Sequence, residues 1–184
     1  MIDYFSIIHK YIPPDSLTYR YYLPHVILVT HRALSVAKRL ALPDRQIQFI
    51  EEAAMLHDIG IVRVQAEKIG CYGKLPYLCH GVEGRNILEA EGLPQHALVA
   101  ERHTGVGISK VDIITNAYPL PQRDMLAESL AEQIISWADL FYSKNPKKIW
   151  YEQSKKKIRK GLAVFGPDKT ERFDQWRTEL EPGK

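Results

Sequence analysis

The chain has 184 residues, of which 45% are hydrophobic, and its formal net charge is +3. This length supports one substantial hydrophobic core and favours a single domain over residues 1–184. The charge is too small to indicate a stable complex with nucleic acid. No apolar run reaches the roughly 18 residues that span a bilayer, and no basic segment followed by a long apolar run opens the sequence. We therefore expect a cytoplasmic protein without a membrane partner.

The first two predicted helices follow from apolar residues spaced three and four apart. One such run predicts an amphipathic helix over about 24–40, which carries His31. Asp44 is a candidate N-cap for a second helix that continues to Leu56.

The end of the second predicted helix brings two candidate functional residues together. His57 and Asp58 follow it directly, and Gly60 is expected to end it in a left-handed conformation. Residues 61–79, rich in glycine, predict a long irregular loop. That loop contains Cys71 and Cys79, which have no second cysteine pair to complete a zinc site and are interpreted as free thiols in a reducing cytoplasm.

Helical patterns return over about 80–90, 94–103 and 126–142, and each of these segments carries one candidate ligand. Two further helical pieces are predicted after residue 146, with Asp168 as the cap of the second. No alternation of period two indicates a strand. The sequence therefore predicts an all-α fold.

Six residues of the predicted helices offer imidazole nitrogens or carboxylate oxygens. They are His31, His57, Asp58, His80, His103 and Asp139. This donor set suits first-row transition metals, and it does not separate iron, manganese, nickel, cobalt and zinc. Each of the six also has an ordinary alternative role as a hydrogen-bonding or capping residue. The remaining histidines, His9, His25 and His96, lack such a context and are interpreted as surface or core residues.

The order and local context of these residues resemble a known family. The segments that carry the likeness are Ala54-Met55-Leu56-His57-Asp58-Ile59-Gly60, His80-Gly81-Val82-Glu83-Gly84, Glu101-Arg102-His103-Thr104-Gly105 and Trp137-Ala138-Asp139. Over about residues 24–143, the chain resembles the HD-domain metal-dependent phosphohydrolases of the HDIG type, most closely the small stand-alone members. This resemblance implies an all-helical bundle around a metal centre, with 144–184 as a C-terminal helical extension.

The resemblance also implies a ligand set for one or two divalent transition metal ions. His31, His57, Asp58 and Asp139 would hold one ion. His80 and His103 match the extra histidines of the dinuclear branch, in which an aspartate at the position of Asp58 bridges two ions. Such a pair of ions activates a water molecule for attack on a phosphate ester. His57 and Asp58 would then lie at the catalytic centre.

The chain departs from the cyclic-dinucleotide phosphodiesterases of the HD-GYP group. It has Ile61 where they have a lysine, a lone His103 where they have two histidines, and no GYP tripeptide. We therefore do not expect hydrolysis of cyclic-di-GMP. Arg63, Arg102 and Lys110 are the candidates to bind the substrate phosphate in place of that lysine, and a surface ion pair is the alternative for Arg102.

The predicted function is that of a phosphomonoesterase or phosphodiesterase acting on a small phosphorylated metabolite, with a nucleotide as the first choice. Two alternatives stay open: a diiron oxygenase on the same scaffold, and a non-catalytic metal-containing ligand sensor. Basic residues crowd the chain after Asp139, beginning with Lys144. They form either a solvated helix face or a rim that attracts an anionic substrate. A monomer and a homo-oligomer are both compatible with the sequence.

Overall fold

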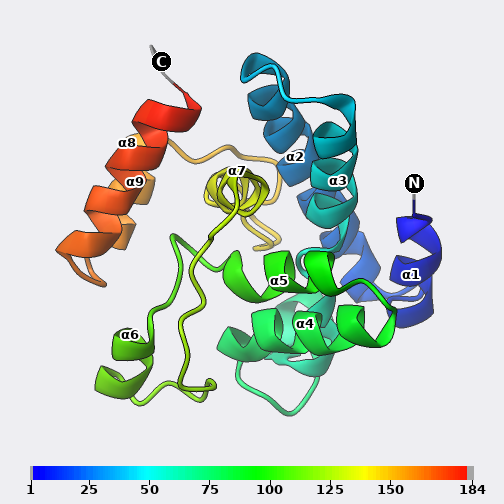
Figure 1. The fold of residues 1–184 in the computed structure, drawn as a ribbon. Helices are drawn as coiled ribbons and strands as arrows, with labels where there is room; N and C mark the ends of the chain where they lie inside the picture. The colour runs from blue at the N-terminus through cyan, green and yellow to red at the C-terminus, as the bar shows by residue number, and fades with distance from the viewer. Residues whose placement is uncertain (1, 182–184) are drawn as a thin grey trace.

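The computed structural model describes residues 2–181, which form an almost entirely helical fold (Figure 1). The α-helices are α1 (Tyr4–Tyr11), α2 (Leu17–Arg39), α3 (Asp44–Leu56), α4 (His80–Ala90), α5 (Pro94–Arg102), α6 (Lys110–Thr115), α7 (Leu130–Asp139), α8 (Lys155–Leu162) and α9 (Pro167–Leu180). Short elements lie between α3 and α4: the 3-10 helices η1 (Ile59–Arg63), η2 (Glu67–Ile69) and η3 (Tyr77–Cys79), and the strands β1 (Gln65–Ala66) and β2 (Cys71–Tyr72). The predicted all-α fold is confirmed.

Helix α7 runs through the middle of the molecule, seen end-on in Figure 1. Helices α2 and α3 lie on one side of it, α8 and α9 on the other, and α4 and α5 below. Trp137 of α7 is fully buried, with its ring 5.1 Å from the rings of both Phe141 and Phe173. Burial of such aromatic surface supplies much of the driving force for packing. Because Phe173 belongs to α9, the segment after residue 143 packs into the same core as the rest of the chain.

Helix α2 begins earlier than predicted. Ser16 caps it by accepting a hydrogen bond from the backbone N–H of Tyr19, so the helix starts at Leu17 and contains Pro24 in its interior. The predicted start at residue 24 was wrong because packing outweighs the cost of a proline in the helix. The phenol of Tyr22 is buried and donates to the carbonyl of Met55, which holds α2 against α3.

Several predicted helix ends were also displaced. Pro43, not Asp44, is the N-cap of α3, and Gly166, not Asp168, is the N-cap of α9. Both aspartates lie in the first helical turn, where a carboxylate interacts favourably with the helix dipole. Helix α7 begins at Leu130, four residues later than expected, because Ser129 caps it. Helices α1 and α6 were not predicted.

Gly60 has a different role from the one predicted. It lies within η1 and not in a left-handed conformation. A Cβ atom at this position would lie 2.0 Å from the carbonyl oxygen of His80 and 2.2 Å from the backbone nitrogen of Gly84. Glycine is therefore needed here because η1 and α4 touch backbone to backbone.

The segment 61–79 is more ordered than an irregular loop. Strands β1 and β2 pair antiparallel, with Gln65 opposite Tyr72 and Ala66 opposite Cys71. Cys71 and Cys79 are buried free thiols, as predicted. Among residues 2–181, no helix is both long enough and apolar enough to cross a membrane.

Candidate metal centre

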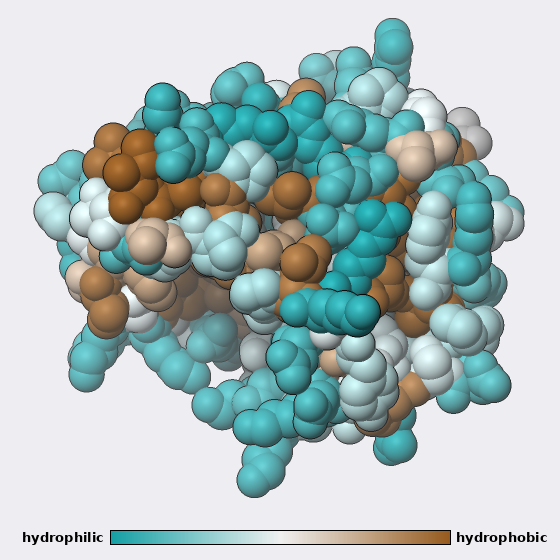
Figure 2. All heavy atoms as spheres, turned by 90° about the horizontal axis from the view of Figure 1, so that it is seen from below, coloured by the Kyte–Doolittle hydropathy of each residue, from teal (hydrophilic) through white to brown (hydrophobic). Residues whose placement is uncertain are grey.

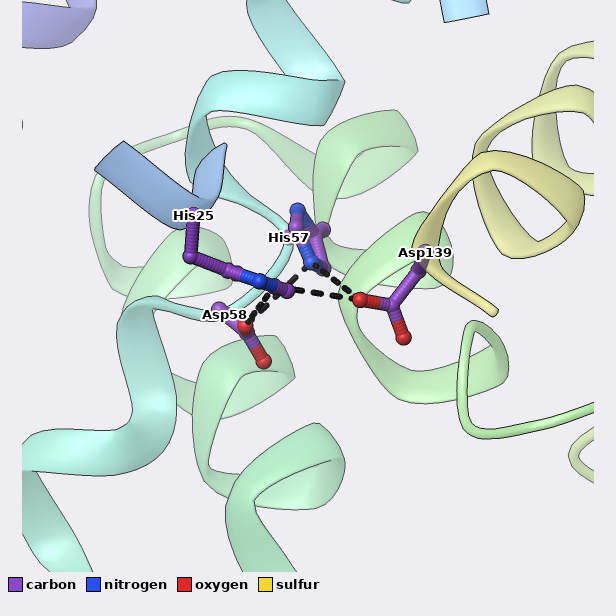
Figure 3. Close-up of side chains that lie close together, drawn as sticks. All are labelled: His25, His57, Asp58 and Asp139. Carbon is purple, nitrogen blue, oxygen red and sulfur yellow. Dashed lines mark ion pairs between the residues drawn. The ribbon is translucent and has the colours of Figure 1, made fainter. Parts of the chain in front are cut away.

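Four side chains from three parts of the chain meet at the centre of the fold (Figure 3). His25 comes from α2, His57 and Asp58 follow α3, and Asp139 ends α7. Nε2 of His25 lies 3.0 Å from Oδ2 of Asp58 and 3.1 Å from Oδ1 of Asp139. Nε2 of His57 lies 3.3 Å and 3.6 Å from the same two oxygens. We call these four residues the first cluster.

A second cluster shares Asp58 with the first. The Oδ1 atom of Asp58 lies 3.4 Å from Nε2 of His80 and 3.4 Å from Nε2 of His103. The two imidazole nitrogens are 3.1 Å apart. Since Oδ2 of Asp58 faces the first cluster and Oδ1 the second, this carboxylate lies between two separate pairs of histidines.

Backbone carbonyls fix the orientation of three of these rings. The Nδ1 atoms of His57, His80 and His103 lie 2.7, 2.7 and 2.8 Å from the carbonyl oxygens of residues 54, 77 and 100. Because a carbonyl only accepts, each Nδ1 carries the proton when its ring is neutral, and the Nε2 lone pair points into the site. Such hydrogen bonds are typical of histidines that bind metal. The second cluster thus directs the lone pairs of His80 and His103 toward each other.

The geometry fits divalent metal ions. Ligand atoms about 2.1 Å from one ion lie roughly 3.0 to 3.4 Å apart when they are arranged octahedrally or tetrahedrally. Most of the distances above lie within or close to this range. In addition, Nε2 of His57 and Oδ1 of Asp58 are buried and have no hydrogen-bond partner within residues 2–181. Buried polar atoms without partners are costly, and a metal ion would engage both once Nε2 of His57 has given up its proton.

Two histidines on opposite sides of Asp58, His57 and His80, differ in charge in the protein without metal. Burial opposes a charge on His57, but the carboxylates of Asp58 and Asp139 outweigh it and raise the pKa of His57 to about 10. Burial lowers the pKa of His80 to about 3. Burial also opposes a charge on Asp58 and by itself would raise its pKa. The Lys144 ammonium and the His57 ring outweigh burial and hold the pKa of Asp58 well below its usual range. His57 is therefore charged and His80 neutral, although both rings face the same Asp58 carboxylate.

The prediction for His31 was wrong, and His25 stands in its place. His31 is exposed on α2, whereas His25 is fully buried in the first cluster. The two histidines are six positions apart in the helix, which turns their side chains roughly 120° away from each other. The apolar positions Val26, Val29 and Ala33 already indicated the inner face of α2. Extending that face toward the N-terminus would have selected His25.

Sequence reasoning also missed Lys144 as part of this site. Its side chain is only 11% exposed and donates a hydrogen bond to Oδ2 of Asp58. Its Nζ lies 3.3 Å from Nε2 of His25. The sequence offered one clue, since Lys144 lies only five positions after Asp139. In the sequence, its charge instead groups Lys144 with the basic residues that follow.

The three predicted phosphate-binding residues lie in other surroundings. Arg63 forms an ion pair with Glu83 at 3.0 Å. Arg102 pairs at 3.1 Å with both Glu128 and Glu132, in line with the ion-pair alternative. Lys110 opens α6, its side chain exposed, and its backbone N–H donates to Asp124. Within the described chain, the cation that contacts the clusters is Lys144.

Two cavities lie beside the clusters. The polar cavity, of about 460 Å³, is lined by Gln65, Ala66, Glu67, Lys68, Ile69, Tyr77, Ser143, Lys144, Asn145 and Pro146. Its walls reach the clusters directly, since the Tyr77 ring stacks on His80 with centroids 4.7 Å apart and Lys144 contacts Asp58. The apolar cavity, of about 400 Å³, includes Leu78 and Thr104, which are close in sequence to His80 and His103.

Hydrophobic side chains surround the apolar cavity. Figure 2 shows them as brown spheres around a hollow on the side of the molecule where α6 and the α8–α9 turn lie. Two exposed hydrophobic residues, Val164 and Phe165, line the cavity, and Val111 and Ile114 are exposed on α6.

The fold and the site define a helical protein with two adjoining histidine and aspartate clusters that could hold metal. A sequence model of the HD domain matches residues 22–143, well over half of the chain. The chain therefore belongs to the HD domain family, which consists generally of metal-dependent phosphohydrolases.

A curated relative is the uncharacterized protein MJ0778 of Methanocaldococcus jannaschii. It is 32% identical to this chain over 120 residues, and the alignment covers 62% of each protein. The aligned region thus spans less than two thirds of the relative's length.

Proposed function

We propose that this protein is a phosphohydrolase that holds two divalent transition metal ions and cleaves the phosphate ester of a small metabolite, such as a nucleotide. The observation that carries the proposal is the position of Asp58. Each of its oxygens faces a different pair of imidazole nitrogens, at 3.0 to 3.4 Å. A carboxylate in this position suits a bridge between two ions, as in two-metal hydrolases.

The first ion would be held by His25, His57, Asp58 and Asp139, and the second by Asp58, His80 and His103. Two such ions supply an activated water and stabilise the charge that develops on the phosphate. The surrounding residues position this centre. The three backbone carbonyls hold the rings of His57, His80 and His103, and the buried core keeps bulk water from the ligands.

The substrate would approach through the polar cavity. Burial raises the pKa of Tyr77 to about 12, so its hydroxyl stays protonated and can donate a hydrogen bond. Two lysines, Lys68 and Lys144, and one acid, Glu67, line this cavity, so its charge suits an anionic group better than that of the apolar cavity, which has one lysine and one aspartate.

Metal content and phosphate release test this proposal. Purified protein should hold about two ions per chain. Asp58→Asn should lose both, whereas His25→Gln should lose mainly the first. His31→Gln is the matched control and should retain the metal of the wild type, because that residue is exposed on the same helix.

A panel of phosphomonoesters and phosphodiesters would then be screened for released phosphate. Turnover that is present in the wild type and His31→Gln but absent in Asp58→Asn would support the proposal. Metal that is retained by Asp58→Asn, or turnover that requires iron and dioxygen and releases no phosphate, would contradict it.

A further inference from the structure

We propose that Lys144 is the cation that binds the substrate's phosphate beside the metal centre. This inference rests on the proposed function and assigns the phosphate contact to a residue outside the three candidates indicated by the sequence. It starts from the position of the ammonium group. Nζ contacts Oδ2 of Asp58 and lies 3.3 Å from Nε2 of His25, at one edge of the first cluster.

The ammonium lies beside the first cluster and not at its centre. Within residues 2–181 its ion pair is with Asp58, while none links it to Asp139, the carboxylate on the far side of His25. The other face of Lys144 lines the polar cavity, where its Nζ lies 6.0 Å from the centroid of the Tyr77 ring. The residue therefore connects the ligands to the space through which a substrate can approach.

Metal binding would free Lys144 to take an anion. In the protein without metal, the ammonium balances the negative charge of Asp58. When Asp58 donates its oxygens to divalent ions, that partner is engaged and the nearby positive charge repels the ammonium. The four-carbon stem of lysine is flexible, so Nζ can turn toward the cavity. A phosphate oxygen bound at the metal centre would then be a new partner for Nζ through a charge-assisted hydrogen bond.

The other candidate cations are already engaged or lie elsewhere. Arg63 and Arg102 pair with glutamates, and Lys110 does not line the polar cavity. Lys68 lines that cavity from η2, but no contact joins it to the clusters within the described residues. Lys144 alone among these residues contacts a residue of the clusters.

The test measures binding of inorganic phosphate to the metal-loaded protein by calorimetry. Lys144→Met removes the charge and keeps the length of the side chain. Lys144→Gln also removes the charge but can still hydrogen-bond to Asp58, so it serves if the first variant does not fold. Lys148→Met is the matched control, since Lys148 is exposed on the same segment. The metal content of every protein is measured in parallel.

We expect both neutral variants to bind phosphate about tenfold to a hundredfold more weakly than the wild type, with unchanged metal content. Lys148→Met should match the wild type, and Lys144→Arg should recover part of the affinity. With a hydrolysable ester, the neutral variants should have a higher KM than the wild type.

Unchanged phosphate affinity in Lys144→Met and Lys144→Gln would overturn the assignment of Lys144 but would leave the proposed function standing. Loss of metal in these variants would also overturn the assignment, because Lys144 would then be a structural partner of the metal ligands. A metal-loaded wild type that binds no phosphate would overturn the proposed function as well.

Discussion

Single residues in this site depend strongly on their neighbours for their charge. His57 and His80 both touch Asp58, yet the pKa of His57 is raised to about 10 and that of His80 is lowered to about 3. Burial lowers the pKa of both rings, but Asp58 and Asp139 together outweigh it at His57, whereas at His80 Asp58 alone does not and the His103 ring lowers the pKa further. Residue type alone could not predict this difference, since both are histidines that open or follow a helix.

The pKa values predict how the stability of the metal-free protein depends on pH. His80 stays neutral in the folded protein but takes up a proton in the unfolded chain below its ordinary pKa of 6.5. Its contribution to stability is therefore lost as the pH falls from 6.5 toward 3. His57 adds little slope below about pH 5.5, where it is protonated in both states, and between that pH and 6.5 its slope is opposite in sign to that of His80.

Urea unfolding between about pH 5 and 6.5, with chelator present, would measure this effect, and the carboxylates contribute mainly below that range. We expect His80→Gln to reduce the pH slope of the unfolding free energy by up to about 1.4 kcal/mol per pH unit. His31→Gln should keep the slope of the wild type, because that side chain is exposed. Equal slopes in the wild type and His80→Gln would show that His80 does not stay neutral in the fold.

At the scale of elements, the sequence predicted the helices that carry ligands better than it predicted their contacts. The segments with His57, His80, His103 and Asp139 were placed correctly, because apolar spacing and glycine or proline boundaries mark helices locally. His25 and Lys144 were missed, because their roles depend on how α2 and the segment after α7 pack around Asp58. Contacts between distant segments leave little trace in local patterns.

Gly60 is another residue whose role depends on a contact between two segments, here η1 and α4. This contact leads to a testable prediction. Gly60→Ala would place a Cβ 2.0 Å from the carbonyl oxygen of His80, so the two backbones must separate. We expect a loss of about 3 kcal/mol or more in unfolding free energy. Metal content should fall too, since η1 follows Asp58 and α4 begins at His80.

Gly161→Ala is the control for this substitution, because no atom lies within 4 Å of the added Cβ and the residue is inside α8. It should be neutral or stabilising by up to about 1 kcal/mol, as alanine favours helix more than glycine does. Equal stability of Gly60→Ala and the wild type would refute the role given to Gly60.

For the whole molecule, the clusters join the helices around the centre of the fold. Their residues come from α2, from the α3–η1 junction, from α4, from the end of α5 and from α7. The extension beyond residue 143 is tied to the same body. Arg32 of α2 lies 2.6 Å from Glu152 and 2.6 Å from Glu181. A ligand held by the clusters should therefore stabilise the entire chain against unfolding.

Metal addition to chelator-treated protein tests this coupling. An ion that binds only the folded state stabilises it by about 2.7 kcal/mol when its free concentration is a hundred times its Kd. Thermal unfolding should therefore shift upward with metal in the wild type and in His31→Gln, and chelator should reverse the shift. Asp58→Asn should show little shift, because Asp58 belongs to both clusters. A His103→Gln variant should retain part of the shift, since the first cluster stays complete. If Asp58→Asn were stabilised as much as the wild type, the metal would bind elsewhere, and the helices would not depend on these clusters for their mutual stability.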